Sequence, residues 1–140
     1  HVLSRRQRQM CIRDRKVSKE CIVGLVTALK IFLDTDQDAV WAEWKRKANY
    51  IAKQLGQIEG IKIVVEDEST VREGPQVIFY FSKDWKGISP DRLKRNLESG
   101  NPSIYLGDGG YGADMNISMV NVRDGEEKII SEKLKEILII

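Results

Sequence analysis

The sequence predicts an α+β domain, in which a small antiparallel or mixed four-stranded sheet carries helices on one face and follows a long linker helix. Two observations favour this class. Helical and strand-like apolar patterns follow one another in the order α-α-β-β-α-β-β-α. Short turns join successive strand-like segments, and such turns connect antiparallel neighbours more readily than parallel ones. The 140 residues are enough for one hydrophobic core.

The first helix is expected to run from about Lys16 to Leu33. Ser18 is a good N-cap, and Glu20 lies in the first turn, where the helix dipole favours an acid. Gly24 is costly inside a helix, so we expect a close packing contact there. The apolar residues recur at the spacing of one buried stripe. They are Cys21, Ile22, Leu25, Val26, Leu29, Phe32 and Leu33.

A second helix is expected to begin after Thr35 or Asp36, either of which can cap it, and to end near Leu55 with Gly56 as its stop. Its core stripe consists of Val40, Trp41, Trp44, Ala48, Ile51, Ala52 and Leu55. We interpret the two tryptophans as core residues, with stacking on a ligand as the alternative. The opposite, polar face contains Glu43, Lys45, Arg46, Lys47 and Lys53. Glu43 and Lys47 stand at i and i+4 and are expected to pair.

Four strands are expected in the rest of the chain. Ile61–Glu66 is β-branched, and Gln76–Ser82 is almost continuously apolar, as a central strand would be. Ser103–Leu106 follows a turn at Asn101 and Pro102, and Met115–Val122 alternates between apolar and polar residues. A short helix starts at Ser89-Pro90-Asp91, where serine caps and proline takes the first helical position.

A last helix is expected from Asp124-Gly125-Glu126-Glu127 onward. Its inward-facing residues are Ile129, Ile130, Leu134, Ile137 and Leu138.

The segment Gly107–Gly112 matches the G-x-G-x-x-G pattern of dinucleotide-binding loops. In those proteins the loop opens a helix whose N-terminus faces the pyrophosphate. Here a polar, alternating strand follows the glycines. A hairpin loop therefore explains the glycines better than a nucleotide site.

Composition excludes several function classes. The chain is 41% apolar and 31% charged, as globular proteins are, and no apolar stretch approaches the roughly 20 residues of a membrane span. His1 is the single histidine, so neither a zinc site nor a Ser-His-Asp triad is expected within this chain. Cys11 and Cys21 do not resemble a disulfide framework, and we expect a cytoplasmic protein. The acids Glu66, Asp67, Glu68, Asp34, Asp36 and Asp38 fall at predicted turns or helix starts, where solvated side chains are the default.

Residues 1–15 differ from the rest of the chain. They hold five arginines and one acid, Asp14, whereas the whole chain carries a net charge of only +2. The remaining sequence therefore has more acids than bases, which argues against nucleic-acid binding by residues 16–140. The leader leaves three interpretations open: an arginine-rich nucleic-acid arm, a disordered natural tail, or non-native sequence that resembles translated sequencing-adapter read-through. We favour the last, which places the native start near Lys16.

Four segments together resemble a known family. Lys16-Val17-Ser18-Lys19-Glu20-Cys21-Ile22-Val23-Gly24-Leu25 is close to the family's K-V-G-K-E-E-I-x-G-L, with Ser18 in place of a glycine. Ile88-Ser89-Pro90, Asn101-Pro102-Ser103-Ile104 and Gly125-Glu126-Glu127-Lys128-Ile129-Ile130 follow in the family's order. Residues 16–138 thus resemble the C-terminal portion of fold-type I pyridoxal-phosphate enzymes. The group in question includes bacterial selenocysteine synthase (L-seryl-tRNA(Sec) selenium transferase) and D-glucosaminate-6-phosphate ammonia-lyase.

This resemblance implies that residues 16–140 form the small C-terminal domain of such an enzyme. The parent would carry pyridoxal 5'-phosphate and would eliminate or replace a substituent on an amino acid or amino sugar acid. The Schiff-base lysine would lie upstream, since no lysine of this chain follows a strand among small polar residues, so the fragment would bind no cofactor and be inactive alone. Lys16 and Lys19 match family positions near the domain junction and are the candidates for lining the substrate entrance. No catalytic, cofactor-binding or metal residue is assigned.

Two partners are implied as well: the missing N-terminal cofactor domain and further copies of the full enzyme. A small domain separated from such partners should expose an apolar face. The alternative from a different class is a free-standing α+β binding or regulatory module, which would hold a small ligand on its sheet face or its glycine loop.

Overall fold

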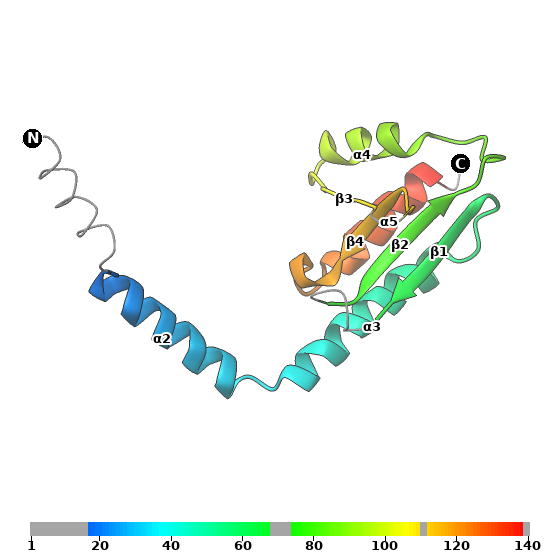
Figure 1. Cartoon of the computed structure of the whole chain (residues 1–140). Coiled ribbons are helices and arrows are strands. Elements are labelled where there is room, and N and C mark those ends of the chain that lie inside the picture. The colour runs from blue at the N-terminus through cyan, green and yellow to red at the C-terminus, as the bar shows by residue number, and fades with distance from the viewer. Residues whose placement is uncertain (1–16, 68–73, 110–111, 139–140) are drawn as a thin grey trace, which may run out of the picture. The chain divides into compact units, whose positions relative to one another are not determined.

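The computed structural model describes residues 17–67, 74–109 and 112–138. The chain divides into two units, residues 1–37 and residues 38–140. The first unit contains helix α2 (Lys19–Asp34), and the interpretations of the leader lie outside the described residues (Figure 1). The elements of the second unit are α3 (Gln37–Leu55), β1 (Ile61–Glu66), β2 (Gln76–Phe81), α4 (Pro90–Glu98), β3 (Gly107–Asp108), β4 (Met115–Ser118), the 3-10 helix η1 (Met119–Asn121) and α5 (Glu126–Leu138).

The four strands form one antiparallel sheet in the order β1-β2-β4-β3. β2 is central, with Phe79 opposite Ile63 on β1 and opposite Met115 on β4. The expected α+β class is therefore confirmed, and the choice between an antiparallel and a mixed sheet is settled as antiparallel.

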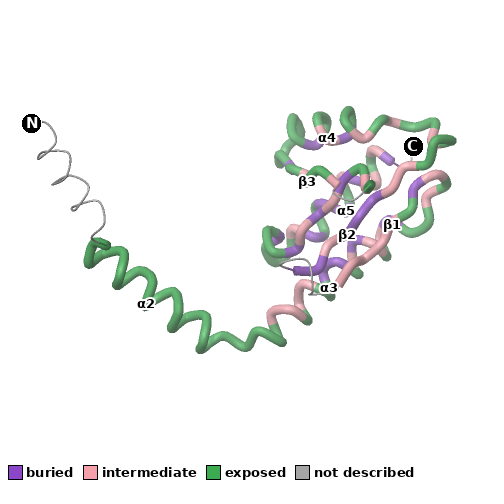
Figure 2. Tube along the Cα trace, viewed as in Figure 1, coloured by how far each residue is buried: buried purple, intermediate pink, exposed green. Residues whose placement is uncertain are grey.

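One face of the sheet forms the core. The register places alternate residues of the strands on this face, and all of them belong to the hydrophobic core or pack against it. They are Ile61, Ile63, Val65, Val77, Phe79, Phe81, Met115 and Ile117. Helices α3 and α5 lie along this face, and the buried segments cluster where they meet the sheet (Figures 1 and 2). The helices contribute Ala48, Ile51, Leu55, Leu93, Leu97, Ile130, Leu134 and Leu138.

Helix α2 begins where the sequence predicts. The Cys21 backbone N–H donates to the Ser18 side-chain oxygen at 3.2 Å, as an N-cap requires. However, no residue of α2 is buried, and its stripe is 50% exposed at Ile22 and 71% exposed at Leu33 (Figure 2). The expectation of a buried stripe is wrong for this chain, because the described part of residues 1–37 contains no second element to cover it. Gly24 has nothing within 4 Å of its added Cβ position, so the expected close contact is wrong too.

The two strands nearest the C-terminus differ from expectation. Ser103–Leu106 is not a strand, because the Ile104 N–H donates to Leu97 O at 2.9 Å and so ties this segment to the end of α4. The strand forms directly after this segment, at Gly107–Asp108. β4 ends at Ser118, and the chain continues into η1 rather than extending as a strand to Val122.

Helix α5 buries a narrower stripe than the sequence indicates. Ile130, Leu134 and Leu138 repeat every four residues and are buried. Ile129 was expected inward but is 41% exposed, since it lies about 100° around the helix from Ile130.

The contrast between α5 and α2 generates a stability prediction. Leu134 is fully buried, so Leu134→Ala should lower the free energy of unfolding by about 2–5 kcal/mol through lost burial and a residual cavity. Leu29→Ala serves as the matched control, because Leu29 is 54% exposed and its loss should change stability by less than about 0.5 kcal/mol. Urea unfolding followed by circular dichroism measures both values. Equal effects of the two substitutions would contradict the burial described here.

Candidate functional site

Of the two lysines predicted to line the substrate entrance, only Lys19 is among the described residues. Lys16 lies outside the described residues. Lys19 is the first residue of α2 and is exposed. A role for either at a substrate entrance stays a prediction.

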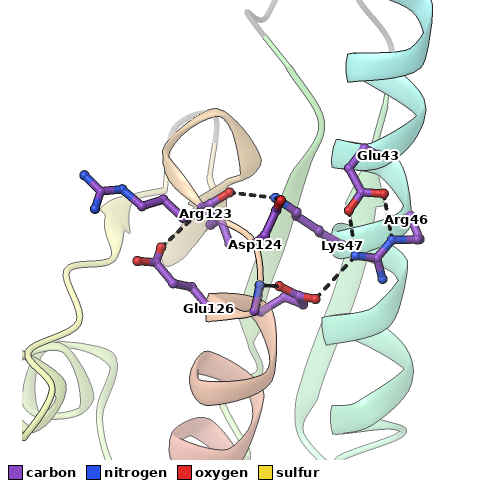
Figure 3. Close-up of polar contacts among 9 residues, drawn as sticks. Glu43, Arg46, Lys47, Arg123, Asp124 and Glu126 are labelled. Carbon is purple, nitrogen blue, oxygen red and sulfur yellow. Dashed lines mark hydrogen bonds and ion pairs between the residues drawn. The ribbon is translucent and has the colours of Figure 1, made fainter.

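A cluster of charged residues lies instead where α3 approaches the start of α5 (Figure 3). Lys47 is 3% exposed, although the sequence places it on the polar face of α3. Its Nζ donates to Val122 O at 3.0 Å and to Asp124 Oδ1 at 2.7 Å. The expected pair between Glu43 and Lys47 is wrong, because Glu43 binds Arg46 through two hydrogen bonds of 2.6 and 2.8 Å.

Glu127 completes this charged cluster from the α5 side. Its side chain is 4% exposed and accepts hydrogen bonds from Gly125 N at 2.8 Å and Arg46 Nη2 at 3.4 Å. Burial raises the pKa of Glu127, but hydrogen bonds from its own N–H, from Arg46 and from Gly125 outweigh burial, so its pKa lies below the ordinary 4.5. The hydrogen bond from Lys47 likewise lowers the pKa of Asp124.

These contacts give the charged cluster a structural role, because they join α3 to the start of α5. The four charged side chains Arg46, Lys47, Asp124 and Glu127 each have an opposite charge within 3.4 Å. A buried charge that is paired and hydrogen-bonded stabilises a connection but offers little free reactivity. Helical periodicity could not find this cluster, since its partners are more than 70 residues apart. The one sequence feature that pointed to this place was Gly125. Its φ of 89° lets the chain turn into α5.

A cavity opens on the other side of the α5 N-terminus. Its volume is about 430 Å³, and it lies between the 102–107 segment, β4 and the first turns of α5. The displaced third strand creates it, because the segment before Gly107 does not pair with Ile117 and Ser118. Its lining residues are Pro102, Ser103, Ile104, Tyr105, Leu106, Gly107, Asn116, Ile117, Ser118, Asn121, Val122, Glu126, Ile129 and Ile130. Sequence reasoning missed this cavity, since it treated residues 103–106 as a paired strand.

A larger, more open cavity of about 1180 Å³ lies around the loop between β2 and α4. Trp85 stands in its wall, with Trp85 Nε1 donating to Ile88 O at 2.8 Å. Its charged lining residues are Glu59, Asp84, Lys86 and Glu136. Three carboxylates against one lysine do not suit the phosphate of pyridoxal 5'-phosphate. The 430 Å³ cavity does not suit it either, because the one charged residue in its lining is the acid Glu126.

The remaining sequence motifs take structural roles. Gly107 and Asp108 pair antiparallel with β4, which confirms the hairpin interpretation of the glycine loop, and Gly112 has a φ of 85°. Trp44 packs against the hydrophobic core, as expected, whereas Trp41 is half-buried outside that core, with its ring centroid 6.4 Å from that of Trp44. Asp67, from one of the acidic clusters, forms an ion pair with Lys45.

Two kinds of feature are absent from the described residues. They contain no group of three His, Cys, Asp or Glu residues placed to hold a metal ion. In the same residues, no helix is both long and apolar enough to cross a membrane.

Comparison with known proteins relates this fold to parts of larger enzymes. No family model matches the chain. A curated protein from Streptomyces sp, named 5'-C-glycyluridine monooxygenase-decarboxylase, is 27% identical over 131 residues, which are 91% of this chain and 32% of that protein. The solved structure of D-glucosaminate-6-phosphate ammonia-lyase superposes with a TM-score of 0.59 at 24% identity, over 90% of this chain and 33% of that one.

These matches extend over nearly the whole chain, which spans about a third of the length of each relative. The structural match shows that the fold is shared with a segment of an ammonia-lyase. It therefore agrees, at the level of fold, with the group that the sequence resembles.

The Glu127 contacts predict a specific dependence of stability on pH. Because the folded pKa of Glu127 is lowered, its contribution is complete above the unfolded pKa and is lost as the pH falls through the folded pKa. Glu127→Gln should therefore be less stable than the parent at pH 7, and the difference should shrink below about pH 4.5. Urea midpoints measured from pH 7 to pH 3 test this. Glu132→Gln, at an exposed position on the same helix, is the control. A Glu127→Gln deficit that stays constant with pH would contradict the assignment.

Proposed function

We propose that residues 16–140 are the small C-terminal domain of a pyridoxal-phosphate-dependent enzyme whose cofactor domain lies in another part of the whole protein. The observation that carries this proposal is the fold shared with one third of D-glucosaminate-6-phosphate ammonia-lyase, over nine-tenths of this chain. The four sequence segments that follow the order of this enzyme group support the same proposal independently. The 1180 Å³ cavity sets three carboxylates against its one lysine, and the 430 Å³ cavity has no lysine, so we assign cofactor binding to the other part.

The substrate class proposed for the whole enzyme is an amino acid or an amino sugar acid. Both relatives' names denote substrates of this kind, since glucosaminate is an amino sugar acid and a C-linked glycyl group is an amino acid. Ammonia elimination, β-replacement and decarboxylation are all reactions that pyridoxal phosphate supports. Elimination or replacement at an amino acid is the reaction we propose, and decarboxylation is the competing outcome.

Helix α2 is the proposed connection to the cofactor domain. The described residues of its own unit do not cover its apolar stripe, and such a continuous apolar surface is typical of a contact with another domain. Lys19, at the start of α2, would then lie near the domain junction and the substrate entrance. We further propose that the whole enzyme is a homo-oligomer of the cytoplasm.

This proposal predicts where the cofactor attaches. After incubation with pyridoxal 5'-phosphate and reduction with borohydride, the 140-residue chain should show no lysine labelled more strongly than in urea-unfolded chain. The full-length protein, expressed from the genomic reading frame upstream of Lys16, should carry one saturably labelled lysine outside residues 16–140. Peptide mass spectrometry locates the label. Saturable labelling of one lysine within residues 16–140 would refute the proposal.

A second candidate function is a free-standing module that binds a small ligand. The 430 Å³ cavity favours it, because this volume falls within the roughly 300–1,000 Å³ of small-molecule sites. A genomic frame that begins near Lys16, with no cofactor domain before it, would decide for this candidate.

A further inference from the structure

The 430 Å³ cavity has the composition of a binding site rather than of a packing defect. Its inner wall is aliphatic and buried: Ile104, Ile117, Val122 and Ile130 are each 5–9% exposed. Apolar walls of this kind favour an apolar ligand group, because its transfer from water is favourable.

The rim of this cavity is unusually apolar for an exposed surface. Tyr105 is 78% exposed and Ile129 is 41% exposed, and both line the cavity. Among the described residues from 38 onward, the one other large hydrophobic residue exposed to this degree is Val120, which belongs to η1 beside the lining residues Asn121 and Val122. Val120 itself does not line the cavity, because its side chain lies beside Gly74 and Trp44. Tyr105 and Ile129 remain, and two exposed apolar side chains at one opening are typical of a binding site.

The charge of the cavity selects the polar end of a ligand. Glu126 is the one charged residue along the lining, and no lysine or arginine is among the lining residues. Glu126 Oε2 accepts a hydrogen bond from Arg123 N at 2.9 Å, whereas Oε1 has no partner among the described residues. In Figure 3 the Glu126 carboxylate lies on the side of the α5 start away from the Lys47–Asp124 pair. This half-buried carboxylate suits a protonated amine and disfavours carboxylates and phosphates.

We propose that this cavity binds a small apolar molecule that carries a protonated amine, with the apolar group between Ile117 and Ile130 and the amine on Glu126 Oε1. Tyr105 and Ile129 cover the apolar group at the rim. The site is independent of the proposed cofactor chemistry, because it takes a cation rather than a phosphate and requires no residue outside this chain.

Three probes of similar size and different charge test the proposal on the 140-residue chain. Phenethylamine is cationic, 2-phenylethanol is neutral and phenylacetate is anionic. Amide chemical shifts are followed in ¹⁵N-labelled protein at pH 7 as each probe is added. We expect saturable shifts at Ile117, Val122 and Ile130, with the amine bound about tenfold more tightly than the alcohol, as one charge-assisted hydrogen bond implies. Phenylacetate should bind more weakly than the alcohol.

Matched variants separate the site from non-specific attraction. Glu126→Gln keeps an acceptor for Arg123 N and should abolish the preference for the amine over the alcohol. Glu132→Gln removes the same charge from the exposed side of α5 and should leave that preference unchanged. The proposal is overturned if no probe produces saturable shifts, if phenylacetate binds as tightly as phenethylamine, or if both variants weaken amine binding equally. It is also overturned if the lining residues shift with protein concentration alone, since the rim would then be a contact between copies.

Discussion

The arrangement of α3 and α5 depends on the buried ammonium group of Lys47. A charge removed from water must be paired and hydrogen-bonded, and the nearest groups that satisfy Lys47 are Val122 O and Asp124. The chain between β4 and α5 is therefore held over the middle of α3. Gly125 turns the backbone at that point, and Glu127 then reaches Arg46 from the first turn of α5. Both helices are thereby fixed against the sheet face that they cover.

The position of this junction also determines where the domain is open. β4 ends at Ser118 because the chain must enter η1 to bring Val122 to Lys47. Before β3, the backbone hydrogen bond from Ile104 N to Leu97 O holds the segment 103–106 against the end of α4. The 102–107 segment and the end of β4 therefore separate, and a cavity forms between them with Glu126 among its lining residues. A structural constraint and a candidate binding site thus share the start of α5.

The two units of the chain differ in how complete they are as folded structures. The second unit buries its apolar residues around one core and pairs its buried charges. In the first unit, α2 has a regular cap and a regular stripe, but no other described residue of that unit covers the stripe. A short helix in water gains most of its stability from packing of its apolar face. The apolar face of α2 is therefore the strongest physical reason to propose a further domain, and the likeness to one third of a larger enzyme gives that domain its proposed character.

The sequence by itself determined the class of the fold and most of its elements. Ser18, Gly56 and the Ser89-Pro90 start mark helix ends through local backbone chemistry, and the bounds of β1 follow from its β-branched run. The tertiary structure alone decided that Lys47 is buried, that residues 103–106 leave the sheet and that Ile129 reaches the surface. Each of these depends on a partner distant in the chain, such as Asp124 for Lys47, and local periodicity contains no information about such partners. For the same reason the sequence indicated a charged surface on α3, whereas the folded chain uses that surface to hold the start of α5.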